Sequence, residues 1–417
     1  MYCRDRRRIY LAFFCKLIII KEAFLMAIYN FDQITDRRNT SCLKYDFSVE
    51  RNHPKDVLPF WVADMDFPAP TEVIEELVNR SRHGIFGYTD VKNEYVETLR
   101  QWFTEHHHWT PEAGSLVVTP GVVYALCTAI RSFTKPGDAV LVQRPVYYPF
   151  LSSIEENNRY LINNALILRN GHYEIDFDDF EQKIIENDVK LFLLCNPHNP
   201  IGRVWRREEL EKLGTICVKH HVVVVADEIH QEFVRTGYQH TVFASINSAF
   251  ASITVTCTAP SKTFNLAGLQ VSNIFIIDKT LRQLFLAEIS ASGYSQPNAL
   301  GLFASQAAYT HGASWLNQVK AYLEENLQKT KVFLQRELPK IKLIEPEGTY
   351  LLWLDFREYH LSDKKLTSIM NDKANLWLDD GYVFGPEGTG FQRINIACPW
   401  ATLAQGLEQL KKAFDNV

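Results

Sequence analysis

The chain has 417 residues, of which 46% are hydrophobic and 22% charged, and its formal net charge at pH 7 is -5. This composition is that of an ordinary globular enzyme and lacks the basic excess of a nucleic-acid-binding protein, so we expect no nucleic-acid partner. At this length a single hydrophobic core stops growing, which predicts two domains that share an interface.

The eight cysteines include no C-x-x-C pair. Cys195 and Cys257 lie in apolar runs, where reduced and buried thiols are expected. The cysteine pattern therefore predicts no metal site and a reducing, cytoplasmic location.

Residues 1–26 differ from the rest of the chain. A basic run from Arg4 to Arg8 precedes an apolar run from Ile9 to Ile20 that Lys16 interrupts. The apolar run is too short and too charged to span a bilayer, and no small-residue cleavage site follows it. We predict an extension outside the fold and no membrane partner; a segment lying at a membrane surface is the alternative.

The next distinctive stretch is Trp61 to Phe67, an apolar segment that contains two aspartates. A helix is predicted after it, capped by Thr71 and ended by Gly84. Its apolar residues fall on one stripe, which predicts one buried face. They are Val73, Ile74, Leu77 and Val78.

A strand from Val117 runs through Gly121 into a helix. The free N–H groups of Gly121 and Val122, at the positive end of the helix dipole, would form a seat for a phosphate group. A short strand from Ala139 to Val142 then leads to Tyr147 and Tyr148.

From residue 177 to residue 277 short apolar strands alternate with amphipathic helices, which predicts a mostly parallel sheet covered by helices on both faces. The expected helices are 177–186 and 207–220, and the expected strands are 190–195, 222–226, 253–256 and 271–277. Ligands of such sheets bind at the carboxyl ends of the strands. Asn199, Asp227 and Lys262 each follow a strand and are therefore candidate site residues.

After about Gly301 a long amphipathic helix, further strands and a final helix predict a smaller α+β domain. The fold class is therefore α/β, with a large sheet domain and a smaller α+β domain. We expect an N-terminal arm and part of the small domain at 27–70, the large domain at 71–305 and the rest of the small domain at 306–417.

Lys262 lies in Thr258-Ala259-Pro260-Ser261-Lys262-Thr263-Phe264-Asn265, a turn directly after a strand of β-branched residues. Partial desolvation beside Phe264 would lower the pKa of the lysine, and a neutral amine can form a Schiff base with an aldehyde. A solvated surface lysine is the alternative on this stretch alone.

Together, Lys262, Asp227, the Asn196-Pro197-His198-Asn199-Pro200 turn and Arg393 in a late strand resemble the fold-type I pyridoxal phosphate enzymes of the aspartate aminotransferase superfamily. The resemblance covers about residues 27–417, which favours Met26 as the working initiator. Within the superfamily the chain is similar to the cystathionine β-lyase, or C-S lyase, branch.

The resemblance implies pyridoxal 5'-phosphate as cofactor and a role for each matching residue. Lys262 would carry the cofactor and move protons, Asp227 would hold the pyridine nitrogen protonated, and Tyr147 would stack on the ring, with Tyr148 as the alternative register. The other cofactor-binding residues would be Gly121, Val122, Asn199, His230, Ser261 and Tyr88. For His230, a solvated position on a helix is the alternative.

Arg393, with Ala63 and Asn199, would bind the carboxylate of a small amino-acid substrate. The family's tyrosine at the Tyr88 position reaches the cofactor of a neighbouring subunit, so the resemblance implies a homodimer with shared active sites.

One position departs from the transaminase pattern. Gln270 stands where Gly-x-Arg-x-Gly would place the phosphate-binding arginine. With the Trp61 to Phe67 segment, this favours a lyase that cleaves cystathionine and related thioethers to a thiol, pyruvate and ammonia. An amino-acid aminotransferase is the alternative, and a pyridoxal phosphate-containing regulatory binding protein is an alternative of another class.

Overall fold

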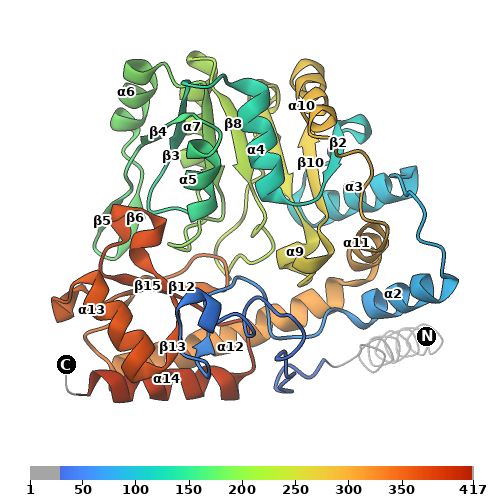
Figure 1. Cartoon of the computed structure of the whole chain (residues 1–417). Helices are drawn as coiled ribbons and strands as arrows, with labels where there is room; N and C mark the ends of the chain where they lie inside the picture. Colours follow the sequence, from blue (N-terminus) through green and yellow to red (C-terminus); the bar gives the residue numbers. More distant parts are fainter. Residues whose placement is uncertain (1–28, 416–417) are drawn as a thin grey trace, which may run out of the picture.

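The computed structural model describes residues 29–415, so the predicted extension at 1–26 lies outside the described residues. Figure 1 shows a large sheet flanked by helices and, beside it, a second smaller sheet. The large sheet has seven strands in the order β2-β10-β9-β8-β7-β3-β4. The strands are β2 (Leu116–Thr119), β3 (Ala139–Val142), β4 (Tyr160–Asn163), β7 (Leu191–Cys195), β8 (Val223–Asp227), β9 (Thr254–Thr258) and β10 (Ser272–Ile276).

The central strands are parallel, as predicted, because β3, β7, β8 and β9 pair in that sense. The exception is β10, which runs antiparallel to both β9 and β2. In the register, Asp227 pairs with Cys195 on one side and with Cys257 on the other. The carboxyl ends of β7, β8 and β9 therefore lie level, and the turns that follow them open on the same edge.

Alternation along the strands supplies a core on each face of the sheet. Val225 packs with α4 (Val122–Phe133), α5 (Tyr148–Glu155) and α10 (Lys279–Ala291). Its neighbours Val224 and Ala226 point to the opposite core, which α6 (Phe177–Asn187), α7 (Arg207–Lys219) and α8 (Ser248–Ala251) cover.

The smaller sheet is antiparallel, in the order β11-β12-β15-β14. Helices pack beside it, the longest of them α12, whose apolar stripe from Trp315 to Leu327 is buried as predicted. Its strands are β11 (Lys342–Leu343), β12 (Leu351–Asp355), β14 (Asp379–Asp380) and β15 (Phe391–Asn395). The helices are α12 (Ala313–Glu337), α13 (Asp363–Ser368), which continues as a π-helical turn (Ile369–Ala374), and α14 (Trp400–Phe414).

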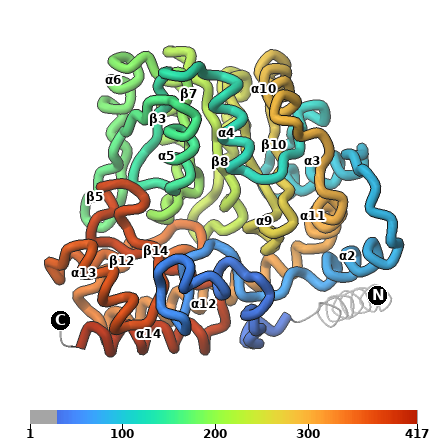
Figure 2. Tube along the Cα trace, viewed as in Figure 1, coloured from blue at the N-terminus to red at the C-terminus, as the bar shows by residue number. Residues whose placement is uncertain are grey.

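Segments from the two ends of the chain pair with each other. β1 (Leu58–Pro59) lies parallel to β13 (Leu376–Trp377), and Figure 2 shows the blue N-terminal segment running along the red C-terminal part. A separate hairpin is formed by β5 (Ile167–Arg169) and β6 (His172–Glu174).

The remaining helices are α2 (Thr71–His83), α3 (Asn93–His107), α9 (Pro260–Thr263) and α11 (Ala299–His311). Gly84 ends α2 with a φ of 76°, as predicted, but Pro70 rather than Thr71 is its N-cap. The predicted stripe is only partly buried, because Val73 is inaccessible whereas Ile74 and Val78 are exposed. None of the helices within residues 29–415 is long and apolar enough to cross a bilayer.

Candidate functional site

A cavity of about 410 Å³ opens at the carboxyl edge of the large sheet. Its walls come from the turns after β7, β8 and β9, from the start of α4 and from the segment before α2. Nine of the predicted residues line this one cavity: Ala63, Gly121, Val122, Tyr147, Asn199, Asp227, His230, Ser261 and Lys262.

Lys262 lies on α9, a single helical turn directly after β9. Its amine donates a hydrogen bond of 2.8 Å to the carbonyl oxygen of Ala63. Although the whole side chain is only partly buried, desolvation lowers the pKa of Lys262 to about 8; the carboxylates of Asp64 and Asp227 oppose this effect and Arg393 adds to it. The amine is therefore available in its neutral form close to physiological pH.

Asp227 ends β8 and is buried. It accepts one hydrogen bond, of 3.2 Å, from the backbone N–H of Ile229. No residue of the described part of the chain forms an ion pair with it. Burial raises the pKa of Asp227 to about 7, against the opposing charge of Lys262. A buried carboxyl without a cationic partner fits a ligand that brings a ring N–H of its own.

Part of the cavity wall can supply backbone N–H donors. Gly121 is the N-cap of α4, and a side chain built on it would meet nothing within 4 Å. Ser261 and Gln270 line the same cavity. A helix N-terminus beside open space and a hydroxyl group fits a phosphate. Together with Asp227 and Lys262, this donor set fits pyridoxal phosphate.

Tyr147 and Tyr148, the two tyrosines between which the sequence left the register open, have different surroundings. Tyr147 lines the cavity, and its backbone N–H donates to the carbonyl of Asn199 at 3.0 Å. Tyr148 instead packs against Phe384 at a ring distance of 5.9 Å. Tyr147 is therefore the tyrosine that can cover a bound ring.

His230 is buried at the cavity wall rather than solvated on a helix. Burial, together with the positive charges of Lys262 and Arg393, lowers the pKa of His230 to about 3. Its Nδ1 atom has no hydrogen-bond partner within residues 29–415. A neutral imidazole with an unused nitrogen can exchange a hydrogen bond with a bound group.

Arg393 lies in the middle of β15 and is buried. Its Nη1 donates to Oδ1 of Asn199 at 2.9 Å, and its Nη2 donates to the carbonyl of Trp61 at 2.6 Å and to Asp379. The hydrogen bond to Asn199 connects this arginine to a residue that lines the cavity. The ion pair with Asp379 was not predicted.

The segment from Trp61 to Phe67, which we call the mouth segment, is fixed from several sides. Asn395 donates to the carbonyls of Val62 and Asp64 at 2.7 and 2.6 Å. Asn265 accepts from the backbone N–H of Met65 and donates to the carbonyl of the same residue, both at 2.9 Å.

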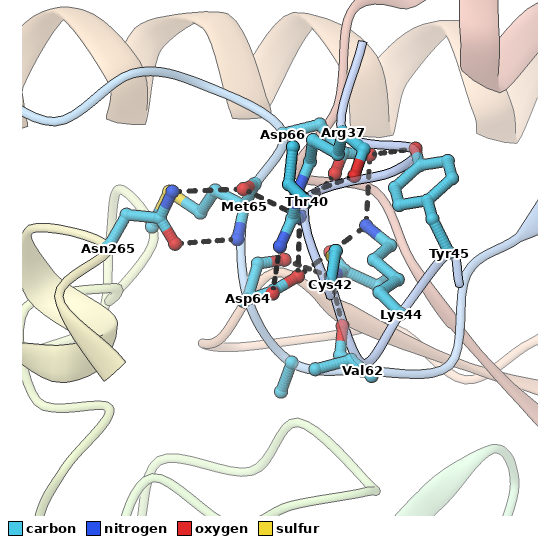
Figure 3. Close-up of polar contacts among 12 residues, drawn as sticks. Arg37, Thr40, Cys42, Lys44, Tyr45, Val62, Asp64, Met65, Asp66 and Asn265 are labelled. Atoms are coloured by element: carbon cyan, nitrogen blue, oxygen red, sulfur yellow. Dashed lines mark hydrogen bonds and ion pairs between the residues drawn. The ribbon is translucent and has the colours of Figure 1, made fainter. Parts of the chain in front are cut away.

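Charged residues of the N-terminal arm complete this anchoring, as Figure 3 shows. Arg37 bridges Asp64 and Asp66, at 2.5 and 2.6 Å. Lys44, almost fully buried, pairs with Asp66 at 2.9 Å. The sequence analysis missed these cations, although the two aspartates of the mouth segment were a signal that partners were needed.

Tyr88 lies apart from the cavity, unlike the other predicted site residues, which line it or, in the case of Arg393, contact a residue that does. Its side chain is 97% exposed, and it borders a separate hollow with Phe86 and residues 293–300. The predicted role of Tyr88 involves a neighbouring subunit, so a single chain leaves that role a prediction.

The comparison with known families gives the class of the protein. A profile of the family "Aminotransferase class I and II" matches residues 55–410. The chain belongs to this family. The predicted family and the predicted fold class are confirmed.

Individual relatives indicate which members of the family the chain is similar to. The chain is 46% identical to cystathionine β-lyase PatB of Bacillus subtilis, over 92% of this chain and 99% of that protein. The structure is similar to that of cystalysin from Treponema denticola, which contains a pyridoxal 5'-phosphate cofactor, with a TM-score of 0.91, 38% identity and coverage of 94% and 100%. It is also similar to the pyridoxal phosphate-bound C-S lyase of Staphylococcus hominis, with a TM-score of 0.87, 34% identity and coverage of 93% and 98%. These names agree with the predicted cofactor and with the predicted lyase branch.

Proposed function

We propose that the protein is a pyridoxal phosphate-dependent carbon–sulfur β-lyase. It cleaves cystathionine and related cysteine thioethers to a thiol, which is homocysteine for cystathionine, and to pyruvate and ammonia. The observation that carries this proposal is the cavity in which the low-pKa amine of Lys262 and the unpaired carboxyl of Asp227 converge. The names of two of the similar proteins, cystathionine β-lyase PatB and the C-S lyase of Staphylococcus hominis, support the same function.

When bound, pyridoxal phosphate supplies an electron sink that stabilises negative charge at the substrate Cα. Lys262 would attach the cofactor and Asp227 would pair with its ring nitrogen. Tyr147 would cover the ring, while Asn199 and His230 would contact its polar edge. Gly121, Val122 and Ser261 would bind the phosphate.

The residues of the chain then have simple tasks. Arg393 and Asn199, with the backbone of Ala63, bind the substrate carboxylate and fix the orientation of Cα. Lys262, neutral above about pH 8, accepts the proton from Cα. The Cβ–S bond breaks, and the sulfur leaves with the bonding electron pair. The three-carbon product hydrolyses to pyruvate and ammonia.

We also propose a homodimer in which Tyr88 serves the active site of the partner. A run of exposed apolar side chains supports an interface at this place, because isolated chains seldom expose so many large apolar groups together. The run consists of Ile74, Val78, Ile85, Phe86 and Tyr88.

The domain boundary between residues 305 and 306 and the cytoplasmic location stay predictions. Residues 305 and 306 both lie inside α11.

The proposed reaction is tested by its products. Purified holoenzyme incubated with cystathionine, without any keto acid, should release homocysteine, pyruvate and ammonia in equal amounts. The cofactor should keep the absorption of its aldehyde form throughout. Accumulation of the amine form of the cofactor, with turnover only after a keto acid is added, would instead establish an aminotransferase.

A further inference from the structure

The hydrogen bonds of Arg393 leave it no free pair of donors. A guanidinium binds a carboxylate with two parallel N–H groups, and each of its two usable edges includes an N–H of Nη2. Both Nη2 hydrogens are already donated, one to the carbonyl of Trp61 and one to Asp379. Within the described chain only Nε lacks a partner, and Nε alone cannot form a two-point contact.

The register of the smaller sheet brings Asp379 next to Arg393. In the antiparallel pairing of β14 with β15, Asp379 lies directly opposite Arg393. Both side chains are nearly inaccessible to solvent. The next residue, Asp380, faces elsewhere and accepts hydrogen bonds from Thr367 at 2.9 Å and from Gln392 at 2.6 Å.

We propose that Asp379 is a positioning residue that competes with the substrate carboxylate for Arg393. The substrate would gain its two-point contact by displacing Asp379 from Nη2, so Asp379 would limit the affinity for carboxylates. This inference rests on the proposed role of Arg393 in the proposed function.

The charges around this contact support such an exchange. Two carboxylates beside one buried guanidinium repel each other unless one takes a proton or moves away. Burial raises the pKa of Asp379 to about 6; Arg393 opposes the increase and Asp380 adds to it. Of the other ionisable groups that interact with this pair, Tyr147, Tyr148 and Tyr350 stay neutral because burial raises their pKa values. His230 stays neutral because burial lowers its pKa to about 3, and burial lowers the pKa of Lys262, which also interacts with Arg393, to about 8.

Before substrate binds, the same ion pair stabilises the arginine. A buried guanidinium without a counter-ion is costly, and removing one partner of a buried pair leaves an uncompensated charge. Asp379 therefore compensates this charge in the empty site, at the cost of weaker substrate binding.

The test compares ligand binding by holoenzymes, using alanine, which has an α-carboxylate but no leaving group. We expect Asp379→Asn to bind alanine, and to be inhibited by acetate, at about tenfold lower concentration than the wild type. Ethylamine, which has the amine but no carboxylate, should bind both proteins equally. Asp380→Asn is the matched control, because it removes a neighbouring charge that does not contact Arg393, and it should leave all three affinities unchanged.

Equal or weaker binding of alanine and acetate by a folded Asp379→Asn protein would overturn the proposal. If that variant does not fold, the wild type decides: acetate inhibition should strengthen as the pH falls from about 8 through 6, where Asp379 gains a proton. Inhibition that is constant over this range would equally overturn it. Acetate inhibition is measured here as competition with alanine for the holoenzyme. Because alanine binding involves no sulfur elimination, these results are independent of whether the lyase reaction itself occurs.

Discussion

The amine of Lys262 and the carbonyl oxygen of Ala63 are 2.8 Å apart, although 199 positions separate the two residues in the sequence. Tyr350 donates to the same carbonyl at 3.0 Å. The contact links the end of β9 to the mouth segment, so the proposed catalytic base and the proposed carboxylate site are joined before any ligand arrives.

Lys262→Ala should abolish turnover, because within the described chain Lys262 is the lysine that lines the cavity. The purified variant should also lack the visible absorption of the covalently held cofactor. Lys320→Ala is a suitable control. Burial lowers the pKa of Lys320 as well, but this lysine lies in a different hollow. Normal absorption and activity of Lys262→Ala would contradict the assignment.

The pKa of Lys262 predicts how pH affects cofactor attachment. Only the neutral amine attacks an aldehyde, and burial lowers the pKa of Lys262 to about 8. The rate at which the apoprotein regains visible absorption after addition of pyridoxal phosphate should therefore rise with pH and level off above about 8. Stopped-flow absorbance measures this rate, and a plateau reached only near pH 10 would show an ordinary solvated lysine.

Asp227→Asn should weaken cofactor binding and lower the rate of elimination by several powers of ten, because an unprotonated ring is a poor electron sink. The same substitution should stabilise the apoprotein. The folded-state pKa of Asp227, about 7, lies above its unfolded value, so ionisation destabilises the fold as the pH rises through about 7.

Above pH 7 the Asn variant avoids this penalty, and its free energy of unfolding should exceed that of the wild-type apoprotein by roughly a few kcal/mol. Below about pH 4 the two proteins should be equally stable. Urea unfolding at several pH values measures the difference. A variant less stable than the wild type at pH 8 would mean that Asp227 is paired in the apoprotein.

Lys44→Met should destabilise the fold, because it leaves the buried carboxylate of Asp66 without its closest lysine partner. Because Arg37 still pairs with Asp66, the expected loss is about 1.5–3 kcal/mol of unfolding free energy, the usual contribution of a hydrogen bond to a charged group. The exposed pair of Arg38 with Asp36 provides the control, since Arg38→Ala should leave the melting temperature unchanged. Calorimetry of both variants tests the prediction.

If Tyr88 serves the partner's site, the activity that Tyr88→Phe loses should be restored in hybrid dimers. Mixing and exchanging inactive Tyr88→Phe and Lys262→Ala subunits gives hybrids with one intact site, and roughly a quarter of the wild-type activity should return. Light scattering and mass spectrometry establish that exchange occurred. Complete exchange without recovered activity would place Tyr88 in the site of its own subunit.

Local patterns predicted the parts of the site that follow directly from the sequence. The strand ends at Asp227 and Cys195 differ from expectation by one residue at most, because apolar runs bounded by polar turns mark buried parallel strands. Arg393 was located correctly because Phe391–Asn395 is the strand that the sequence indicated.

What the sequence did not predict depends on pairing between distant segments. Asp379 lies in a strand of two residues, which has no detectable alternation, and its contact with Arg393 depends on the register of β14 with β15. The reversed direction of β10 is a matter of topology, since an apolar strand has the same pattern in either direction. The exposure of Ile74 and Val78 depends on which surfaces α2 packs against, and periodicity alone does not give it.

The contacts of Asn395 with the mouth segment also bear on how the protein is synthesised. Asn395 and Val62 are 333 positions apart, and translation at about 5–20 residues per second separates their appearance by roughly 15 to 70 s. The strand β1 likewise cannot pair until β13 has been synthesised, near the end of the chain. The large sheet, which ends at residue 276, can be completed earlier on the ribosome. The cavity is therefore complete, and able to bind the cofactor, only after almost the whole chain has been translated.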